Sequence, residues 1–454
     1  QNFHAAILLA PRIIAMVARM SLQNIPNSCD TMVALPSATR NHETIFAKNS
    51  DRPAEECQPL VQQVRASYQD SRSTGCQYVP IPQSGSTLAH IGSRPYWCWG
   101  YEHGFNENQV VIGNEALHSK LPIATEPKLI GMELVRLGLE RGRDAAQAVE
   151  VITSLVSEYG QGKFEAPDLR SYDNGFIVAD PNEAYIIETA GHEWAVKRVE
   201  STVGISNIYS LGTDWDKVSP DAKSKAVAKD WSDISSSQFD FSEAYSEHTA
   251  SEPGRSSERR ARSCTFLQQN IPGIDARTMM DILRDHSDGS SPGEEISTQI
   301  STTSSICAHY SSSVDGNTAA SLVADLCADG SRIPIYWCSF YAPCLSVFLP
   351  IFLEGTIPEE LSIGNKNPSA DSPWWVFRNL EHKIRRGNEI DLTIVDQIRS
   401  EWVDLQDELL ETAYERAASA GILIQEGEET ALSHMLTEYM RENFDRALEI
   451  ARHI

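Results

Sequence analysis

The sequence has no long hydrophobic run and no excess of basic residues. None of its apolar segments reaches the roughly 18 residues that a membrane-spanning helix needs, so we expect no such helix and no membrane partner. Its 454 residues include 63 acidic against 38 basic side chains, a formal charge of −25. Nucleic acids bind basic patches through counterion release, so this charge argues against a nucleic-acid partner.

Several short motifs are also absent. There is no CxxC pair, N-x-S/T sequon, P-loop, GxGxxG or HExxH, and the nine cysteines are irregularly spaced. Cys338 and Cys344 have no histidine at zinc-ligand spacing, and His192, His286 and His309 are isolated in the sequence. We therefore expect no metal and no cofactor, histidines at the surface or in the core, and a reduced, cytoplasmic protein.

The first 28 residues allow two interpretations. Ala5 to Ala10 is apolar, and Pro11 and Arg12 interrupt the run before a second apolar stretch. A signal or transit peptide would give this pattern. In the other interpretation Met20 is the natural start and the preceding residues are upstream sequence.

A hairpin is predicted directly after Cys29. Thr31 to Leu35 has the pattern of a buried strand, a polar turn covers residues 36–43, and Thr44 to Lys48 is a second strand. The start of one strand lies beside the end of its antiparallel neighbour. The hairpin therefore places Lys48 and Asp51 close to Cys29.

Helices and strands alternate along the rest of the chain. Strand pairing is predicted for Asn174 to Ala179 with Ala184 to Thr189, and helices for Leu129 to Leu139 and Asp144 to Glu158. Further strands are predicted at residues 60–65 and 76–81, and a further helix from Arg262 to Asn270. From residue 391 the sequence is acidic and helical, with apolar stripes that can pack on the rest of the chain or mediate homo-oligomer formation. The stripes comprise Leu392, Val395, Ile398, Trp402, Leu405, Leu409 and Leu410, then Leu432, Met435, Leu436, Tyr439, Phe444, Leu448 and Ile450.

Four segments, in order, resemble the secernin and acid dipeptidase family of cysteine peptidases. They are CDTMVALPSAT, FAKNSDRP, GNEAL with its preceding WGYEHGFNEN, and DNGFIVADPNEAYIIETAGHEWAVKRV. The resemblance covers residues 29–355. It implies an α+β fold, the four-layer αββα sandwich of N-terminal nucleophile hydrolases. We divide the chain into a leader or propeptide (1–28), the hydrolase domain (29–390) and a C-terminal helical extension (391–454).

In this family Cys29 would be both nucleophile and new N-terminus. A thiol attacks an amide only as the thiolate, and an α-amine with a pKa of about 7.7–8.0 suits the role of its base. That amine exists only after the bond between Ser28 and Cys29 is cut. The alternative is an ordinary core cysteine on a buried strand.

The resemblance also assigns roles to other residues. Lys48 would stabilise the thiolate, Asp51 would orient the terminal ammonium, and Asn114 would donate its amide to the oxyanion. Asn207 would be a second positioning or oxyanion residue. An arginine before a helix in related acylases matches Arg262 or Arg259, and we choose Arg262. Near Asn114 in the sequence are residues that either line a substrate pocket or belong to the core: Glu115, His103, Trp97 and Trp99.

The function implied is a cysteine dipeptidase, or a close amidohydrolase variant, acting on a small peptide or another small amide through a thioester acyl-enzyme after self-cleavage before Cys29. The alternative is a secernin-like cytosolic regulator of exocytosis without significant peptidase activity. Two departures from the family are a leader of 28 residues, which is long unless translation starts at Met20, and the divergent segment Tyr336 to Phe348.

Overall fold

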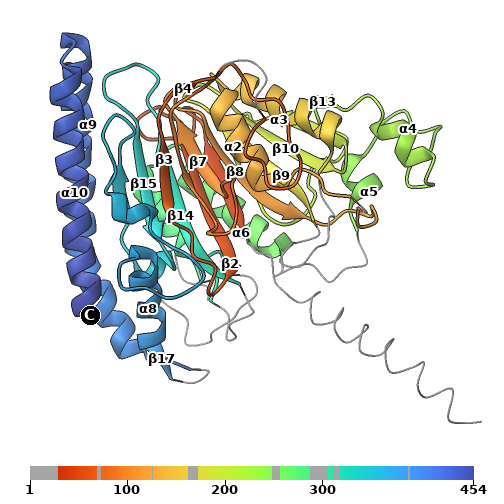
Figure 1. Cartoon of the computed structure of the whole chain (residues 1–454). Coiled ribbons are helices and arrows are strands. Elements are labelled where there is room, and N and C mark those ends of the chain that lie inside the picture. Colours follow the sequence, from red (N-terminus) through yellow and green to blue (C-terminus); the bar gives the residue numbers. More distant parts are fainter. Residues whose placement is uncertain are drawn as a thin grey trace, which may run out of the picture.

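The computed structural model describes residues 29–68, 73–124, 126–161, 172–247, 256–286, 305–309, 316–386 and 389–454. The predicted leader, residues 1–28, lies outside this part of the chain. Two antiparallel sheets dominate the described residues, and their strands run side by side through the middle of the molecule (Figure 1). All nine cysteines are free thiols. No helix among the described residues is long and apolar enough to cross a membrane.

The first sheet has six strands, and Cys29 directly precedes one of them. Its second strand in space begins directly after Cys29, and Thr31 pairs with Lys48, which confirms the predicted hairpin. Every residue of this strand is buried. In spatial order the strands are β12 (Thr202–Ile205), β1 (Asp30–Ala34), β2 (Ile45–Pro53), β14 (Gly316–Asp325), β15 (Ile335–Phe340) and β16 (Leu349–Ile351).

A β-bulge interrupts the pairing of β14 with β2. Thr318 is opposite Asp51, but Ala320 is opposite Ser50, so Ala319 is an extra residue in β14. The Ala319 carbonyl accepts hydrogen bonds from the Tyr341 amide at 3.0 Å and from the indole of Trp374 at 2.8 Å. The bulge therefore shifts the pairing register of β14 by one residue, while the carbonyl of its extra residue keeps hydrogen-bond partners.

The second sheet has eight strands and covers the inner face of the first. Contacts of β1 with two of its strands join the sheets, and buried apolar residues from both form one core. In spatial order the strands are β13 (Lys217–Val218), β11 (Glu193–Arg198), β10 (Ala184–Ala190), β9 (Asp173–Ala179), β8 (Val111–Leu117), β7 (His103–Asn106), β6 (His90–Ser93) and β3 (Leu60–Gln63).

Helices cover both outer faces. On the eight-stranded sheet lie α2 (Gly131–Arg141) and α3 (Ala145–Tyr159), with a second hydrophobic core beneath them. On the six-stranded sheet lie α6 (Ser256–Asn270), α7 (Ala276–Leu283) and α8 (Pro373–Ile384). The predicted four-layer αββα fold is confirmed (Figure 1). The smaller elements are β4 (Ala66–Ser67), β5 (Ser86–Thr87), β17 (Arg385–Arg386), β18 (Glu389–Ile390), α4 (Ala222–Val227), α5 (Phe241–Tyr245), η2 (Pro343–Leu345) and η3 (Glu359–Ser362).

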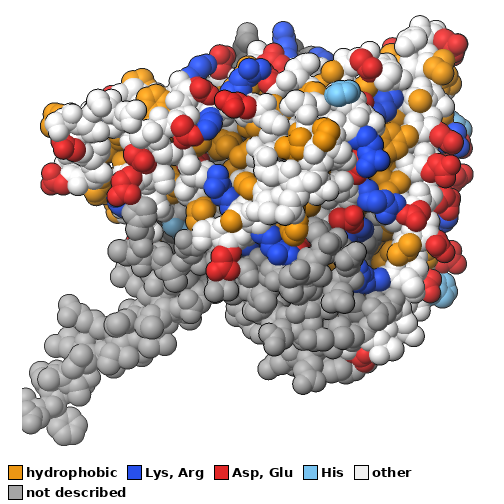
Figure 2. All heavy atoms as spheres, turned by 180° about the vertical axis from the view of Figure 1, so that it is seen from behind, with side chains coloured by type: hydrophobic (Ala, Val, Ile, Leu, Met, Phe, Trp, Pro, Cys, Tyr) orange, Lys and Arg blue, Asp and Glu red, His pale blue; other side chains and the backbone are white. Residues whose placement is uncertain are grey.

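The C-terminal extension is a helical hairpin packed on the molecule. It consists of α9 (Leu392–Glu426) and α10 (Glu429–His453), and Gly427 ends α9 with a φ of 76°, the left-handed conformation that glycine adopts most readily. The predicted stripes face the core: Ile398, Trp402, Leu405, Leu409, Leu432, Leu436, Tyr439, Phe444 and Leu448 are buried. Acidic side chains gather along the outer edge that this hairpin forms (Figure 2). Self-association through it stays a prediction.

One predicted element has different bounds, and one is absent. The helix predicted from Arg262 begins at Ser256, because the polar residues Ser256, Arg259 and Ser263 occupy buried positions and hide the helical pattern. Residues 76–81, predicted as strand, form bends without a strand.

Candidate active site

Cys29 lies directly before β1 in a closely packed polar environment. Its main-chain N–H donates to Oδ1 of Asn207 at 2.7 Å, and its sulfur accepts a hydrogen bond from the N–H of Asp51 at 3.3 Å. The residue is only 6% exposed. Both atoms that the predicted chemistry needs, the nitrogen and the sulfur, are therefore held by neighbouring strands and loops.

Burial controls the acidity of this thiol in the uncut chain. Burial raises the pKa of Cys29 well above its ordinary value, the positive charge of Lys48 lowers it, and the charges of Glu115 and Glu102 raise it further. The nitrogen of Cys29 is an amide in this chain, so it cannot act as a base. The thiol of the uncut chain is consequently protonated at neutral pH.

Lys48 is fully buried between the two sheets. Its Nζ donates to the carbonyl of Asn114 at 2.6 Å and lies 3.4 Å from Oε1 of Glu115. Burial opposes its charge, but attraction to Cys29 and Glu115 outweighs burial and raises the pKa of Lys48. Burial likewise raises the pKa of Glu115 to about 8, against the opposing effects of Lys48 and a hydrogen bond from Thr31. The Lys48 ammonium is therefore the charged partner available to the Cys29 sulfur.

Asp51 contacts the sulfur through its backbone. Its carboxylate oxygen Oδ1 accepts a hydrogen bond from Thr318 at 2.7 Å, next to the bulge of β14. Lys48 and Asp51 are thus both brought to Cys29, as the hairpin predicts. The orientation of a terminal ammonium by the Asp51 carboxylate concerns the cut chain and stays a prediction.

Asn114 has its side chain on the other face of β8. Its neighbours Gly113 and Glu115 face Lys48, and alternate residues of a strand point to opposite faces. The Asn114 carboxamide lies 3.0 Å from Oδ1 of Asn174, beside α2. With its oxygen and nitrogen exchanged, the amide NH2 donates to the carbonyl of Glu102 at 2.9 Å and to its Oε2 at 3.1 Å. The structure does not bring this side chain to the sulfur. Its role at the oxyanion stays a prediction.

Asn207 belongs to a fully buried network around the Cys29 peptide. Its Nδ2 donates to the carbonyl of Ala116 at 3.1 Å, and its Oδ1 accepts a second hydrogen bond from Arg259 at 2.7 Å. Arg259 also donates to Ser206 at 2.7 Å, and the Ser206 hydroxyl donates to the Cys29 carbonyl at 3.3 Å. The nitrogen and carbonyl of Cys29 are therefore both fixed by partners of one guanidinium.

The arginine at this site is Arg259, not the predicted Arg262. Arg259 pairs with Asp30 at 2.9 Å and both side chains are fully buried, whereas Arg262 pairs with Asp285 and is 22% exposed. A sequence signal for this exists. The buried positions of α6 recur every three or four residues, and Arg259 belongs to that stripe while Arg262 does not: Ser256, Arg259, Ser263, Phe266 and Leu267.

Four residues near Asn114 in the sequence could line a pocket or belong to the core, and the structure divides them into two groups. Glu115 belongs to the site, and buried His103 lies close enough to Lys48 for burial and that charge to lower its pKa. Trp99 packs under Arg136, whose guanidinium is 4.0 Å from the ring centroid, and Trp97 packs in a small core with Cys98. The tryptophans are therefore packing residues.

A second buried charge cluster lies next to Asp51 along β2. Arg52 pairs with Glu102 at 2.8 Å and with Glu56, and its guanidinium lies 3.4 Å from the hydroxyl of Tyr172. The charge of Glu102 reaches the Cys29 thiol, since it contributes to the raised pKa. This cluster was not predicted, because its members are distant in the sequence.

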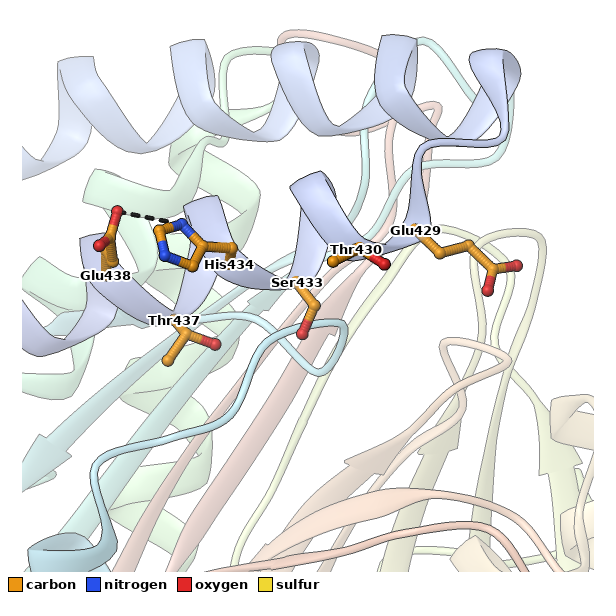
Figure 3. A pocket seen from close by; sticks show the side chains of 6 residues that line it. All are labelled: Glu429, Thr430, Ser433, His434, Thr437 and Glu438. Carbon is orange, nitrogen blue, oxygen red and sulfur yellow. Dashed lines mark ion pairs between the residues drawn. The ribbon is translucent and has the colours of Figure 1, made fainter.

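Two surface pockets described in the structure lie elsewhere. One, of about 580 Å³, is lined by Glu429, Thr430, Ser433, His434, Thr437 and Glu438 of α10 (Figure 3). His434 and Glu438 form an exposed ion pair at 3.2 Å there. The other is lined by Cys264, Thr265, Gln268 and Gln269 of α6. Neither includes Cys29 or its neighbours.

Replacing Asn207 by alanine tests the network around Cys29. The change removes the acceptor for the Cys29 nitrogen and a donor to Ala116, so we expect amide hydrolysis to fall by about 10²–10³-fold, mostly in kcat. Steady-state kinetics of the purified variant measure this. Asn106→Ala is a matched control, since Asn106 is equally buried but bonds to Leu139 and Gly142 instead. Equal losses in both variants would show a general packing effect.

The Cys29 thiol at the start of a buried strand, in a β-sandwich between helices, agrees with the family match that follows, and together they support a cysteine-type amidohydrolase. The model of peptidase family C69 matches residues 28–385, and the chain belongs to this family. The match begins one residue before Cys29, where the described part of the chain starts. The family includes secernin and dipeptidase-type cysteine peptidases, so the predicted resemblance is confirmed.

Solved structures of amide-hydrolysing enzymes are also similar to this chain. Penicillin V acylase from Agrobacterium tumefaciens is 13% identical with a TM-score of 0.42, and the match covers 71% of this chain and 86% of that one. A mutant conjugated bile acid hydrolase from Clostridium perfringens is 10% identical (TM-score 0.38, 69% and 89% covered). An N-acylethanolamine-hydrolyzing acid amidase ortholog from Caenorhabditis elegans is 12% identical (TM-score 0.35, 65% and 92% covered).

Proposed function

We propose that this protein is a cysteine dipeptidase made as a precursor, which becomes active when the bond before Cys29 is cut. The observation that carries the proposal is the paired contact of Cys29: its nitrogen bonds to Asn207 at 2.7 Å and its sulfur to the Asp51 N–H at 3.3 Å. Any buried main-chain N–H needs an acceptor, but here the acceptor is a side chain held in a buried polar network, and the sulfur also accepts a hydrogen bond. The intact chain holds the future amine and the thiol together before either can react.

Cutting the chain supplies the missing base. The new α-amine of Cys29 takes the thiol proton, and Lys48 favours the resulting thiolate. The sulfur attacks the substrate carbonyl, the ammonium returns its proton to the leaving amine, and a thioester remains. Water, deprotonated by the same amine, then attacks the thioester and releases the acid and the thiol. Asn207 keeps the amine in place throughout.

A dipeptide would need partners for two charges. An unblocked dipeptide carries an ammonium and a carboxylate, and side chains of both signs, Glu102 and Arg52, lie near the thiol, where they are paired with each other in the uncut chain. Glu102 lies close enough to Cys29 to act on its pKa. Membership of the C69 family supports the same substrate class, since the family includes dipeptidase-type peptidases.

Mass spectrometry with a substrate panel tests the proposal. We expect the purified protein to have Cys29 as its N-terminus by intact mass and N-terminal sequencing. We also expect it to hydrolyse unblocked dipeptides at least about tenfold faster than their N-acetylated forms, because tenfold corresponds to about 1.4 kcal/mol and loss of one partner of a buried charge pair costs about 2 kcal/mol or more. Equal rates on both forms would leave an amidohydrolase without dipeptide preference. A chain that keeps residues before Cys29 and hydrolyses neither would contradict the enzyme and favour a cytosolic regulator of exocytosis.

A further inference from the structure

Two histidines and two cysteines form a compact cluster outside the catalytic network. The four residues are His286, Cys307, His309 and Cys344, and their nitrogen and sulfur ligand atoms all lie within 4.8 Å of one another. His309 Nε2 is 3.1 Å from the sulfur of Cys344 and 3.4 Å from that of Cys307. All four are buried, with exposed fractions of 8% or less. His286 and His309 are isolated in the sequence and are buried, one of the two positions expected for them, but the fold brings them together with two thiols.

The spacing of these atoms matches a tetrahedral metal site. Zinc binds sulfur at about 2.3 Å and imidazole nitrogen at about 2.0–2.1 Å, which places neighbouring ligand atoms of a tetrahedron about 3.3–3.8 Å apart. The distances from His309 are close to this range. Two thiols and two imidazoles are a ligand set typical of structural zinc, and oxygen-preferring cations such as Mg²⁺ or Ca²⁺ do not favour it.

Glu381 of α8 orients one of the ligands. Its Oε2 lies 2.9 Å from Nδ1 of His309, so Nδ1 donates to the carboxylate and Nε2, on the side of the two sulfurs, is the nitrogen that would bind a metal. A carboxylate behind a histidine is the usual support of a metal-binding imidazole, since it fixes the tautomer and the ring orientation. This contact points to a ligand independently of the four clustered residues.

We propose that His286, Cys307, His309 and Cys344 bind one zinc ion that has a structural role. Four protein ligands complete a tetrahedron and leave no position for a substrate or water, unlike a catalytic zinc site. Binding replaces the two thiol protons, which leave to solvent, and involves no oxidation. The short-range spacing rules could not find this site, because its ligands come from three segments far apart in the sequence.

The ion would fix one wall of the catalytic site. Ala308, between two ligands, donates its N–H to the hydroxyl of Thr318 at 2.9 Å, and Thr318 in turn donates to the carboxylate of Asp51. Asn49 of β2 donates to the carbonyl of Ile306 at 2.9 Å. The zinc would thus tie the segment 305–309 to α7, η2 and α8 just behind β2.

Metal analysis of the full-length protein tests the proposal directly. Protein purified without chelators should contain about one zinc ion per chain by elemental mass spectrometry. After removal of zinc, added Co²⁺ should give intense visible bands with thiolate-to-cobalt charge transfer, as expected for a tetrahedral site with sulfur ligands. Wild-type protein that has less than about one tenth of an equivalent of zinc and gives no such bands with Co²⁺ would overturn the proposal.

Matched variants locate the ion. Cys344→Ser should lose the zinc and the cobalt bands, whereas Cys338→Ser, a buried thiol on β15 outside the cluster, should keep both. Cys29→Ser should also keep both, which separates this site from the catalytic thiol and makes the proposal independent of the proposed function. Should Cys344→Ser fail to fold, the wild-type zinc content and cobalt spectrum still decide. Peptide mapping that locates a disulfide between Cys307 and Cys344 in native protein purified without chelators would also contradict it, since oxidised sulfurs cannot serve as thiolate ligands.

Discussion

The Cys29→Ser variant is expected to remain uncut and to lose amide hydrolysis by at least about 10³-fold, because the reaction then lacks its nucleophile. A serine hydroxyl is much less acidic than a thiol, so neither Lys48 nor an α-amine yields a useful alkoxide at neutral pH. The substitution changes the shape of the buried side chain little. Folding should therefore be preserved, and the loss should be chemical.

Intact mass and dipeptide hydrolysis measure the two expected results for Cys29→Ser separately. An uncut variant beside a cut wild type shows that the sulfur performs the cleavage. A cut but inactive variant shows that another protease performs it, and catalysis still depends on Cys29. Cys57→Ser is the control, since Cys57 is also fully buried but lies beside Ser372. Undiminished hydrolysis by Cys29→Ser would contradict the assignment of the nucleophile.

Replacing Arg259 by methionine is expected to destabilise the protein by about 3–5 kcal/mol, because it leaves the charge of Asp30 buried without its partner. Arg262→Met removes a pair whose carboxylate, Asp285, is only 2% exposed but whose arginine is 22% exposed, so water can replace the guanidinium and the cost should be smaller, about 1–3 kcal/mol. Chemical denaturation followed by tryptophan fluorescence gives both values. The double variant Asp30→Asn with Arg259→Met should recover part of the loss, since no charge then stays unpaired.

Arg259 also positions Asn207 and Ser206, so kinetics separate this role from stability. At a temperature where the variant is folded, Arg259→Met should lower kcat more than it raises KM, because the contacts of the Cys29 nitrogen and carbonyl loosen. Arg259→Lys keeps the charge but not the forked geometry, and should recover stability more than kcat. A larger kinetic defect in Arg262→Met would contradict the choice of Arg259.

Local sequence pattern was sufficient for the part of the site that one hairpin builds. The apolar run after Cys29, the polar turn and the second strand fix the pairing of Thr31 with Lys48, and with it the approach of Asp51 to the sulfur. The same strand alternation applies to Asn114, but sequence does not show which face of β8 is the inner one. The structure shows that Gly113 and Glu115 lie on the inner face of β8, towards Lys48.

The positions of the arginine and of the histidine and cysteine cluster depend on long-range packing, which the local sequence does not show. Arg259 and Arg262 are three residues apart on one helix, and only the face that α6 turns to β1 and β12 distinguishes them. The cluster of His286, Cys307, His309 and Cys344 needs the helical, loop and sheet layers to be in place first. A search for fixed spacings cannot detect ligands that the tertiary fold assembles.

The extra residue in β14 also limits where the length of this chain can vary. Side chains alternate along a strand, so the extra residue Ala319 sets which residues on either side of it face the second sheet and which face the helical layer. Deleting one residue here would turn Thr318 away from Asp51 and withdraw the carbonyl that Trp374 uses. Loops far from the sulfur can vary in length, whereas the number of residues in β14 is fixed, because its contacts connect the C-terminal helices with the strand that holds the nucleophile.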